Sequence, residues 1–286
     1  MIIAGIVCYH PQTSLLKKSL DSIAGNVSSI VVIDNGSDNV EEISDCCQSY
    51  PNVKLIKNEK NEGIAKALNQ IFQHADEMGG DYVLCLDQDS IMPEGMVQTY
   101  KKVLRDYSDK ERIGILCPRI HDRATNRTWP AVPDGAEVSK TERCITSGSL
   151  NSLPAWKEVG GFDEYLFIDE VDHDYSFRII QNGYAILLCT DVVIDHQIGN
   201  TVIRHLFGKT IYVRNHNAFR KYYMVRNMIY VGKKHYGRVR VRDVGHAVLF
   251  TLKTIIYESD KRNKLKACFK GMADGCKHNH GENIKV

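Results

Sequence analysis

The sequence lacks a run of apolar residues long enough to cross a membrane. A helical span needs about 20 consecutive, mostly apolar residues, and no stretch of these 286 residues approaches that length. The opening segment, residues 1–7, is apolar but lacks a basic flank and a cleavage site. It therefore predicts a first strand and argues against a secretory signal peptide.

The sequence also lacks any Cys-x-x-Cys pair, although it contains nine cysteines. Their number is odd, and several of them lie within strand-like runs. A disulfide framework or a zinc site requires paired cysteines at regular spacings. Neither is expected here, and the cysteine usage fits a reducing cytoplasm.

Acidic residues are scarce in the last part of the chain. Residues 204–286 carry 19 Lys and Arg against 5 Asp and Glu, a net charge of +14, whereas residues 1–203 carry 18 against 30, a net charge of −12. Such a basic segment is typical of a solvated face, a nucleic-acid surface or an anionic membrane surface. Because RNA-binding motifs are lacking, we favour contact with a membrane or with phosphate over contact with nucleic acid.

Apolar runs and helical spacings alternate through the first half of the chain. Continuous short apolar runs predict buried strands, and apolar residues three and four positions apart predict helices. Strands are expected at residues 2–9, 30–33, 53–57 and 82–86, and helices at 14–23, 40–50 and 64–78. This order favours an α/β fold with a mostly parallel central sheet flanked by helices.

Polar residues follow three of these strands. Tyr9 ends the first strand, the segment 34–38 follows the second, and Asp87-Gln88-Asp89 follows the fourth. Because the exits of parallel strands meet at one edge of an open sheet, we expect these residues to line one crevice. Two carboxylates one residue apart can share a hard divalent cation whose other ligands are phosphate oxygens. Taken alone, Asp-x-Asp also fits a surface turn, and Asp34 also fits an Asx-turn or a helix N-cap.

The third expected helix begins with small residues. Gly63, Ala65 and Ala67 allow a close approach to the backbone, and Asn61 is placed to cap the helix. Capping does not explain Asn69, which falls inside the helix. Asn69 is therefore a candidate to face the same crevice.

These motifs together resemble family 2 glycosyltransferases, inverting enzymes with the GT-A fold. The resemblance rests on the segments 33–37, 61–69 and 86–89 and extends to about residue 230. The Asp-Gln-Asp-Ser form is similar to rhamnosyltransferase-like members. In this family the residue that matches Asp34 contacts the nucleotide base, and the Asp-x-Asp holds a divalent cation on the diphosphate. The donor-binding residues that we expect are Tyr9, Asp34, Asn35, Asn61, Gly63, Lys66, Asn69, Asp87, Gln88, Asp89, Arg220 and Arg226.

The middle of the chain is expected to bind the acceptor. Trp129 lies in a polar stretch, where it could stack on a sugar ring or anchor the loop. Gly148 belongs to a Ser-Gly turn that resembles the acceptor side of the family. The acceptor-binding candidates are Trp129, Gly148 and Asp169.

Six acidic residues crowd positions 163–174, where helical spacing begins near Val171. Inverting transfer needs one carboxylate to take the proton from the attacking hydroxyl. Matching this segment to the family puts that base at Asp172, with Asp169 and Asp174 as alternatives. The family usually has Glu at the position of Val171. The rhamnosyltransferase-like variant departs from this pattern in the same way. The simpler interpretation of Asp172 is a carboxylate favoured by the N-terminal end of a helix.

Three further features follow the acidic segment. His196 ends a short strand expected at 192–196 and could either be structural or complete the metal site with Asp87 and Asp89. The stretch 199–215 is a candidate lid. Arg220 and Arg226 recur on a helix and could bind the diphosphate, or belong to a solvated basic face.

The C-terminal end predicts two more helices, one of them at residues 243–257. In the other, an apolar stripe of four residues is flanked by lysines. Such a helix can lie on an anionic leaflet or pack against its own domain. The stripe consists of Leu265, Cys268, Phe269 and Met272.

The expected protein is a metal-dependent glycosyltransferase with a catalytic domain at residues 1–205 and a basic, helical segment at 206–286. The resemblance implies Mn²⁺ or Mg²⁺, and a nucleotide-sugar donor, dTDP-rhamnose first and a UDP-hexose second. It also implies a glycan or lipid-linked acceptor in bacterial surface polysaccharide synthesis, at the cytoplasmic face of the membrane. A sugar-1-phosphate nucleotidyltransferase is disfavoured because no Gly-rich, Arg-Lys loop follows the first strand. A non-catalytic nucleotide-binding protein would not need Asp172.

Overall fold

The computed structural model describes residues 1–123, 125–132, 135–196, 202–206, 209–213 and 215–278, and it describes no side chains between 196 and 213. Contacts divide the chain into two compact units. Unit 1 contains residues 1–167 and 171–196, and unit 2 contains residues 168–170 and 197–286. Each unit is described by itself.

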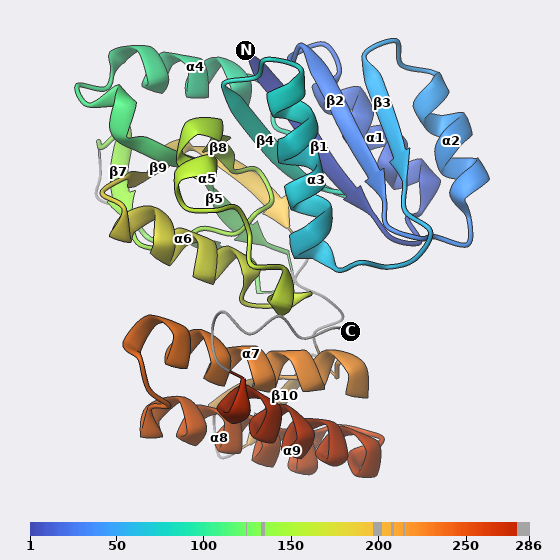
Figure 1. The fold of residues 1–286 in the computed structure, drawn as a ribbon, viewed down its shortest axis with the longest axis vertical. Helices are drawn as coiled ribbons and strands as arrows, with labels where there is room; N and C mark the ends of the chain where they lie inside the picture. The colour runs from blue at the N-terminus through green and yellow to red at the C-terminus, as the bar shows by residue number, and fades with distance from the viewer. Residues whose placement is uncertain (124, 133–134, 197–201, 207–208, 214, 279–286) are drawn as a thin grey trace. The chain divides into compact units, whose positions relative to one another are not determined.

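The first half of unit 1 alternates strands and helices, as the sequence predicts (Figure 1). β1 lies between β2 and β4 and pairs with both in parallel, and β3 extends the parallel order beyond β2. The elements are β1 (Ile2–Cys8), α1 (Thr13–Ile23), β2 (Ser29–Asp34), α2 (Val40–Gln48), β3 (Val53–Lys57), α3 (Ile64–Glu77) and β4 (Tyr82–Asp87).

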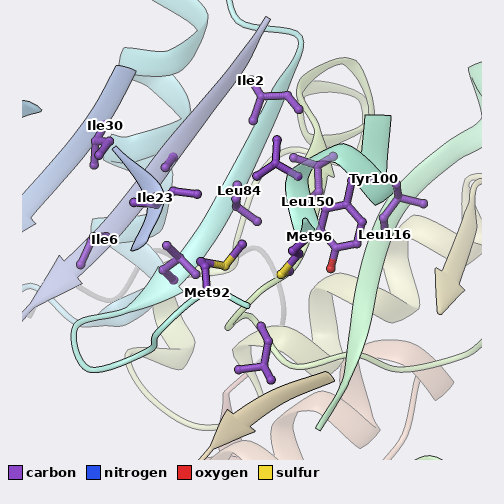
Figure 2. Packing of buried hydrophobic residues seen from close by; sticks show 14 of the residues in the cluster. Ile2, Ile6, Ile23, Ile30, Leu84, Met92, Met96, Tyr100, Leu116 and Leu150 are labelled. Atoms are coloured by element: carbon purple, nitrogen blue, oxygen red, sulfur yellow. The ribbon is translucent and has the colours of Figure 1, made fainter. Parts of the chain in front are cut away.

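Helices cover both faces of this sheet. Because successive residues of a strand point to opposite faces, Ala4 and Ile6 of β1 pack in one cluster with Leu16 and Leu20 of α1. On the other face, a Cβ at Gly5 would lie 2.3 Å from Cγ2 of Ile71 in α3, so glycine permits this close contact. Figure 2 shows how side chains from β1, β2, β4 and neighbouring elements fill the first cluster.

The second half of unit 1 completes a nine-stranded sheet in the order β3-β2-β1-β4-β8-β5-β9-β7, with β6 paired to β5. Here β5 and β9 pair in parallel, whereas β8, β6 and β7 pair antiparallel with their neighbours. The strand expected at 192–196 is the end of a longer β9. The elements are α4 (Met96–Asp106), η1 (Lys110–Arg112), β5 (Ile113–Asp122), β6 (Arg127–Trp129), β7 (Val138–Thr141), β8 (Leu150–Ser152), α5 (Leu153–Glu158), η2 (Glu164–Leu166), α6 (Val171–Gln181) and β9 (Ala185–His196).

Unit 2 contains the antiparallel strands β10 (Val202–Leu206) and β11 (Lys209–Val213) and the helices α7 (Ala218–Tyr236), α8 (Val241–Tyr257) and α9 (Lys261–Lys277). Glycines let α9 lie against α7. A Cβ at Gly271 would be 2.6 Å from the backbone oxygen of Tyr222, and one at Gly275 would be 2.6 Å from that of Arg226.

The expected apolar stripe of α9 is only partly correct. Cys268 is buried and Met272 packs beside it, but Phe269 is exposed. The buried side of the helix is set by its close approach to α7, and consists of Lys264, Cys268, Gly271 and Gly275. Among the described residues, no helix is long and apolar enough to cross a membrane.

Lys221, Lys264 and Glu258 form a cluster of buried charged side chains in unit 2. Glu258 accepts a hydrogen bond from Nζ of Lys221 at 2.5 Å and from Nζ of Lys264 at 3.0 Å. Lys221 also donates to Oγ1 of Thr254 at 3.0 Å. Burial lowers the pKa of Lys221, and the bond to Glu258 opposes that shift. A single carboxylate thus compensates two buried ammonium groups.

Candidate functional site

Carboxylates of β2 and β4 reach the same edge of the sheet. Cys8 of β1 pairs with Asp34, and Val7 pairs with Asp87. One strand therefore separates the two acidic residues, which corresponds to about 10 Å between their backbones. Asp34 is buried, Asp87 is half-buried and Asp89 is exposed. The parallel register puts Asp34 and Asp87 at the same edge of the sheet, and the crevice that they are expected to line stays a prediction.

Asp34 shapes the turn that follows β2. Its carboxylate accepts a hydrogen bond from the backbone N–H of Ser37 at 3.2 Å, which makes an Asx-turn. The hydroxyl of Ser37 in turn accepts from the N–H of His10 at 2.8 Å, so the exits of β1 and β2 are joined. Asp34 is not the N-cap of α2, because that position belongs to Asn39.

Asn35 connects the exit of β2 to the start of α3. Its amide donates to Oδ1 of Asn61 at 3.0 Å and accepts from the N–H of Glu62 at 3.0 Å. Asn58, which the sequence did not single out, donates to the same Asn35 oxygen at 3.1 Å. The Asn35 side chain is buried, and its bonds fix the 58–62 loop beside the exit of β2.

Gly63, and not Asn61, is the N-cap of α3, so the expected capping role of Asn61 is wrong. Asn61 instead accepts from the N–H of Gly63 at 2.9 Å. Gly63 has a φ of 86°, and a Cβ there would lie 2.9 Å from Cα of Phe167. The N–H of Ile64 donates to the carbonyl of Phe167 at 2.6 Å. The segment that leads to α6 therefore lies against the start of α3.

Gln88 joins the exit of β4 to that of β1. Its side-chain oxygen accepts from the N–H of Tyr9 at 2.8 Å, and the Tyr9 ring is exposed. Behind this turn, the hydroxyls of Ser90 and Ser147 are 2.7 Å apart. The exits of β1, β2 and β4 are thus tied into one rim by side chain to backbone bonds.

The rim fits a cation that is shared with a ligand better than one held by the protein alone. No group of three or more His, Cys, Asp or Glu side chains suited to a metal occurs in the part of the chain that is described. Asp87 and Asp89 supply two carboxylates, and Mg²⁺-type ions often keep only one or two of these and take their other ligands from phosphate and water. The side chain of His196 lies outside the described residues, so its metal role stays a prediction.

Asp172 lies in the first turn of α6 and is half-buried, and its Oδ1 accepts from the N–H of His173 at 2.9 Å. Its two alternatives have other tasks. Asp174 is fully buried and accepts from Nε of Arg178 at 2.9 Å. Asp169 accepts from two nitrogens of Arg220, at 3.0 and 3.1 Å. The role of Asp172 as the proton acceptor stays a prediction.

The residues expected on α7 lie in unit 2. Arg220 forms an ion pair with Asp169. The guanidinium of Arg226 lies 4.6 Å from the ring centre of Tyr223 and donates to Oδ1 of Asn227 at 2.8 Å. Asn227 was not among the candidates. Its amide donates to the carbonyls of residues 168 and 169 at 2.7 and 2.9 Å. Only its place in the Arg-Asn pair could have marked it in the sequence.

Other candidates have partners within the protein. Lys66 pairs with Glu62 at 2.9 Å, which raises the pKa of the lysine and lowers that of the glutamate. Asn69 is buried and bonds the backbone of Phe162 through both atoms of its amide. Its expected place in the crevice stays a prediction, but here it holds the loop before α6.

The two remaining acceptor candidates differ in their surroundings. Trp129 is exposed at the end of β6, as a sugar-stacking residue would be. Gly148 faces the interior instead, because a Cβ there would lie 2.2 Å from Cδ1 of Ile194 and 2.9 Å from Cγ of Pro118. Its geometry supports a packing role, and acceptor binding by Gly148 stays a prediction.

A pocket of about 790 Å³ lies away from this rim. Its walls include Arg112, at the start of β5, and Ala185, at the start of β9. Those are the opposite ends of parallel strands from the ends that carry Asp34 and Asp87. Ligands of open α/β sheets bind at the carboxyl ends, so we place the candidate site at the rim.

Comparisons with known proteins agree with this geometry. The chain is similar to the dTDP-rhamnosyl transferase RfbF of Shigella flexneri, with 28% identity over an alignment of 289 residues. The alignment covers 96% of this chain and 95% of the relative. Its structure is similar to that of S. aureus TarS 1–349 in complex with UDP-GlcNAc, with a TM-score of 0.58, 14% identity, and coverage of 96% of this chain and 80% of that one.

It is also similar to GalNAc-T7 with UDP, GalNAc and Mn²⁺, with a TM-score of 0.62, 15% identity and coverage of 95% of this chain. The chain spans only 54% of that protein. At such identities the structural likenesses show the fold, which is the GT-A fold. The model of Glycosyl transferase family 2 matches residues 5–150, just over half of the sequence. The chain belongs to glycosyl transferase family 2 and is a glycosyltransferase.

Proposed function

We propose that this enzyme transfers rhamnose from dTDP-rhamnose, with inversion, to a hydroxyl of a glycan or lipid-linked acceptor. The carboxylates of Asp34, Asp87 and Asp89 at the exits of two strands beside β1 carry this proposal, because they suit a nucleotide and its diphosphate. The dTDP-rhamnosyl relative, matched over nearly the whole chain, supports the choice of donor. A UDP-hexose is the second choice, since two similar structures hold UDP or a UDP-sugar.

The residues of the rim divide the binding of the donor among them. Asp34 would accept a hydrogen bond from an N–H of the base, within a turn that is already ordered by Ser37. Asp87 and Asp89 would hold Mg²⁺ or Mn²⁺ together with the diphosphate oxygens. That cation supplies positive charge for the departing diphosphate, so a second carboxylic acid is not required.

Asp172 performs the proton transfer in this mechanism. Its carboxylate takes the proton of the acceptor hydroxyl while the hydroxyl oxygen forms a bond to the anomeric carbon. The bond from that carbon to the diphosphate oxygen breaks on the opposite side, and the nucleoside diphosphate leaves with the bonding electron pair. The ion pairs of Asp174 and Asp169 support this assignment, because a carboxylate gripped by arginine is a poor base.

The proposed acceptor indicates the cellular role of the enzyme. We place the enzyme at the cytoplasmic face of the membrane, where it extends a lipid-linked glycan for a bacterial surface polysaccharide. The basic charge of residues 204–286 supports contact with an anionic surface.

A donor panel tests the function directly. Purified protein with Mn²⁺ is incubated with dTDP-rhamnose and UDP-hexoses, and the nucleoside diphosphate released is measured. We expect dTDP from dTDP-rhamnose. Release from a UDP-hexose alone would replace the donor, and release from none, with lipid acceptors present, would favour a nucleotide-binding protein.

Asp172→Asn tests the base. It should lower sugar transfer by roughly 10²- to 10⁴-fold, the usual contribution of a general base, and leave donor binding almost unchanged. The matched control is Asp45→Asn, an exposed residue of α2, which should transfer sugar normally. Full turnover by the Asp172 variant would remove this residue from the mechanism.

A further inference from the structure

Helix α8 is amphipathic in the inverse sense: it buries polar residues within unit 2 and exposes apolar ones. Its buried side consists of Asp243, Ala247, Thr251 and Thr254. Its exposed apolar side chains are Val241 (89%), Val248 (43%), Leu249 (58%), Leu252 (46%) and Ile256 (61%). We call these five residues the α8 apolar face.

Specific bonds fix this orientation. Asp243 accepts two hydrogen bonds from Arg240, each of 2.7 Å, and packs so closely on α7 that a Cβ at Gly232 would lie 2.0 Å from its Oδ2. Thr254 accepts from the buried Lys221 at 3.0 Å. If α8 rotated to bury Leu249 and Leu252, these bonds would break, and Lys221 and Asp243 would lose these polar partners. The apolar face is therefore turned outward by the packing of the unit.

The face forms one continuous stripe. With 3.6 residues per turn, positions 241, 248, 252 and 256 lie within a third of the helix circumference. Arg242, His246 and Lys253 follow one border of the stripe at the same spacing, and all three are exposed. Long basic side chains at such a border can keep their charges in water while apolar neighbours are immersed.

The surroundings are also basic. Exposed cations of α9 include Lys261, Arg262, Lys266 and Lys270. Within the described residues, neither Arg242 nor Lys253 makes an ion pair. An apolar stripe bordered by unpaired cations is complementary to a leaflet that contains anionic headgroups.

We propose that the α8 apolar face docks on an anionic lipid bilayer, with α8 lying in the plane of the headgroups. At about 1.5 Å per residue its 17 residues extend for about 25 Å, which suits an interfacial helix. Pairing of two such faces across a twofold axis would instead bring like charges of Arg242 and Lys253 near their copies, which is unfavourable. The purpose of the docking rests on the proposed lipid-linked acceptor, but the docking itself needs no donor.

Vesicle sedimentation tests the proposal with the full chain. Vesicles of phosphatidylcholine, with and without about one third phosphatidylglycerol, are mixed with the protein at low salt. We expect binding to the anionic vesicles only. The double variant Leu249→Gln/Leu252→Gln should weaken that binding at least tenfold, since it removes two apolar side chains that would enter the leaflet. Arg242→Gln and Lys253→Gln should each weaken it roughly fivefold.

The matched control is Ile180→Gln, which removes a similarly exposed apolar side chain from α6 of unit 1 and should bind as the parent does. All substituted residues are exposed, so unchanged thermal melting should confirm that the variants fold. Absence of binding to either vesicle, or equal binding by the double variant, overturns the proposal. So does a stable dimer in solution that the double variant dissociates, because a second copy would then occupy the face.

Sugar transfer separates this proposal from the proposed function. Release of dTDP from dTDP-rhamnose is measured without vesicles, on the parent and on the double variant. An active enzyme that does not bind vesicles contradicts the docking alone. A vesicle-binding protein that transfers no sugar contradicts the function alone.

Discussion

The buried charges of unit 2 give a prediction whose size follows from the structure. In Glu258→Gln, an amide replaces the carboxylate that Lys221 and Lys264 both contact, at 2.5 and 3.0 Å. All three side chains are buried, so water cannot take over the lost interaction. Removal of one partner from a buried ion pair costs about 3–5 kcal/mol. In a unit of this size 1 kcal/mol corresponds to about 4–8 °C, so its melting temperature should fall by at least ~10 °C.

The loss should also depend on pH. Burial lowers the pKa of Lys221, so between that value and the pKa of an unfolded lysine the unfolded chain binds more protons, and stability rises with pH. Without Glu258 the pKa of Lys221 should fall further and this window should extend downward. The loss of stability in Glu258→Gln should therefore be smaller at about pH 9.5 than at neutral pH, because pH 9.5 lies just below the ordinary lysine pKa of roughly 10.4.

The assay is calorimetric melting of the full chain, with circular dichroism to follow the helices. The matched control is Glu77→Gln, whose carboxylate is exposed and pairs with His74 at 2.8 Å. Such surface pairs contribute about 0–1 kcal/mol, so its melting curve should nearly overlay that of the parent. If Glu258→Gln melted within about 2 °C of the parent at neutral pH, the two lysines would not depend on this carboxylate.

Three further predictions concern the site and the loop before α6. Gly36→Ala should raise the KM for the donor more than it lowers kcat, because a Cβ at φ 80° would lie 2.5 Å from the backbone carbon of Lys60 and displace the loop beside Asp34; an unchanged KM in steady-state assays would contradict this. Asn227→Leu leaves two carbonyls of residues 168 and 169 without their donor and should cost about 1–3 kcal/mol for each, measured by thermal melting; a neutral effect would show that water replaces the amide. EDTA should stop sugar transfer and added Mn²⁺ should restore it, and full activity in EDTA would exclude the metal role of Asp87 and Asp89.

Strands buried on both faces were predictable because their signal is local. Each of the runs 30–33 and 82–86 is a continuous apolar segment bounded by polar residues, and both became strands within a residue or two. Val138–Thr141 is instead mostly polar, and it is a strand because it pairs with β9. A strand that depends on a partner about 50 residues away carries little signal in its own sequence.

The residues of the candidate site also differ in whether local sequence or long-range contacts determine their surroundings. Asp34 and Asp87 could be placed together from topology alone, since parallel strands fix which ends meet. The role of Asn35 could not be foreseen, because its partners Asn58 and Asn61 lie on a loop whose conformation depends on those bonds. Gly148 was assigned to the acceptor from its motif, but its surroundings are set by Ile194 and Pro118, which only folding brings near.

The short segment before α6 has a backbone conformation that side chains of unit 2 hold. Residues 168–170 belong to unit 2 and α6 to unit 1, so the chain leaves unit 1 for three residues just before the proposed base. Asp169 and Glu170 have φ values of 65° and 63°, each of which costs on the order of 1–2 kcal/mol for a residue other than glycine. Bonds from Arg220 and Asn227 hold this conformation. Two consecutive residues at positive φ therefore depend on side chains of α7, and a change in either α7 residue should alter the conformation of residues 168–170 within unit 2.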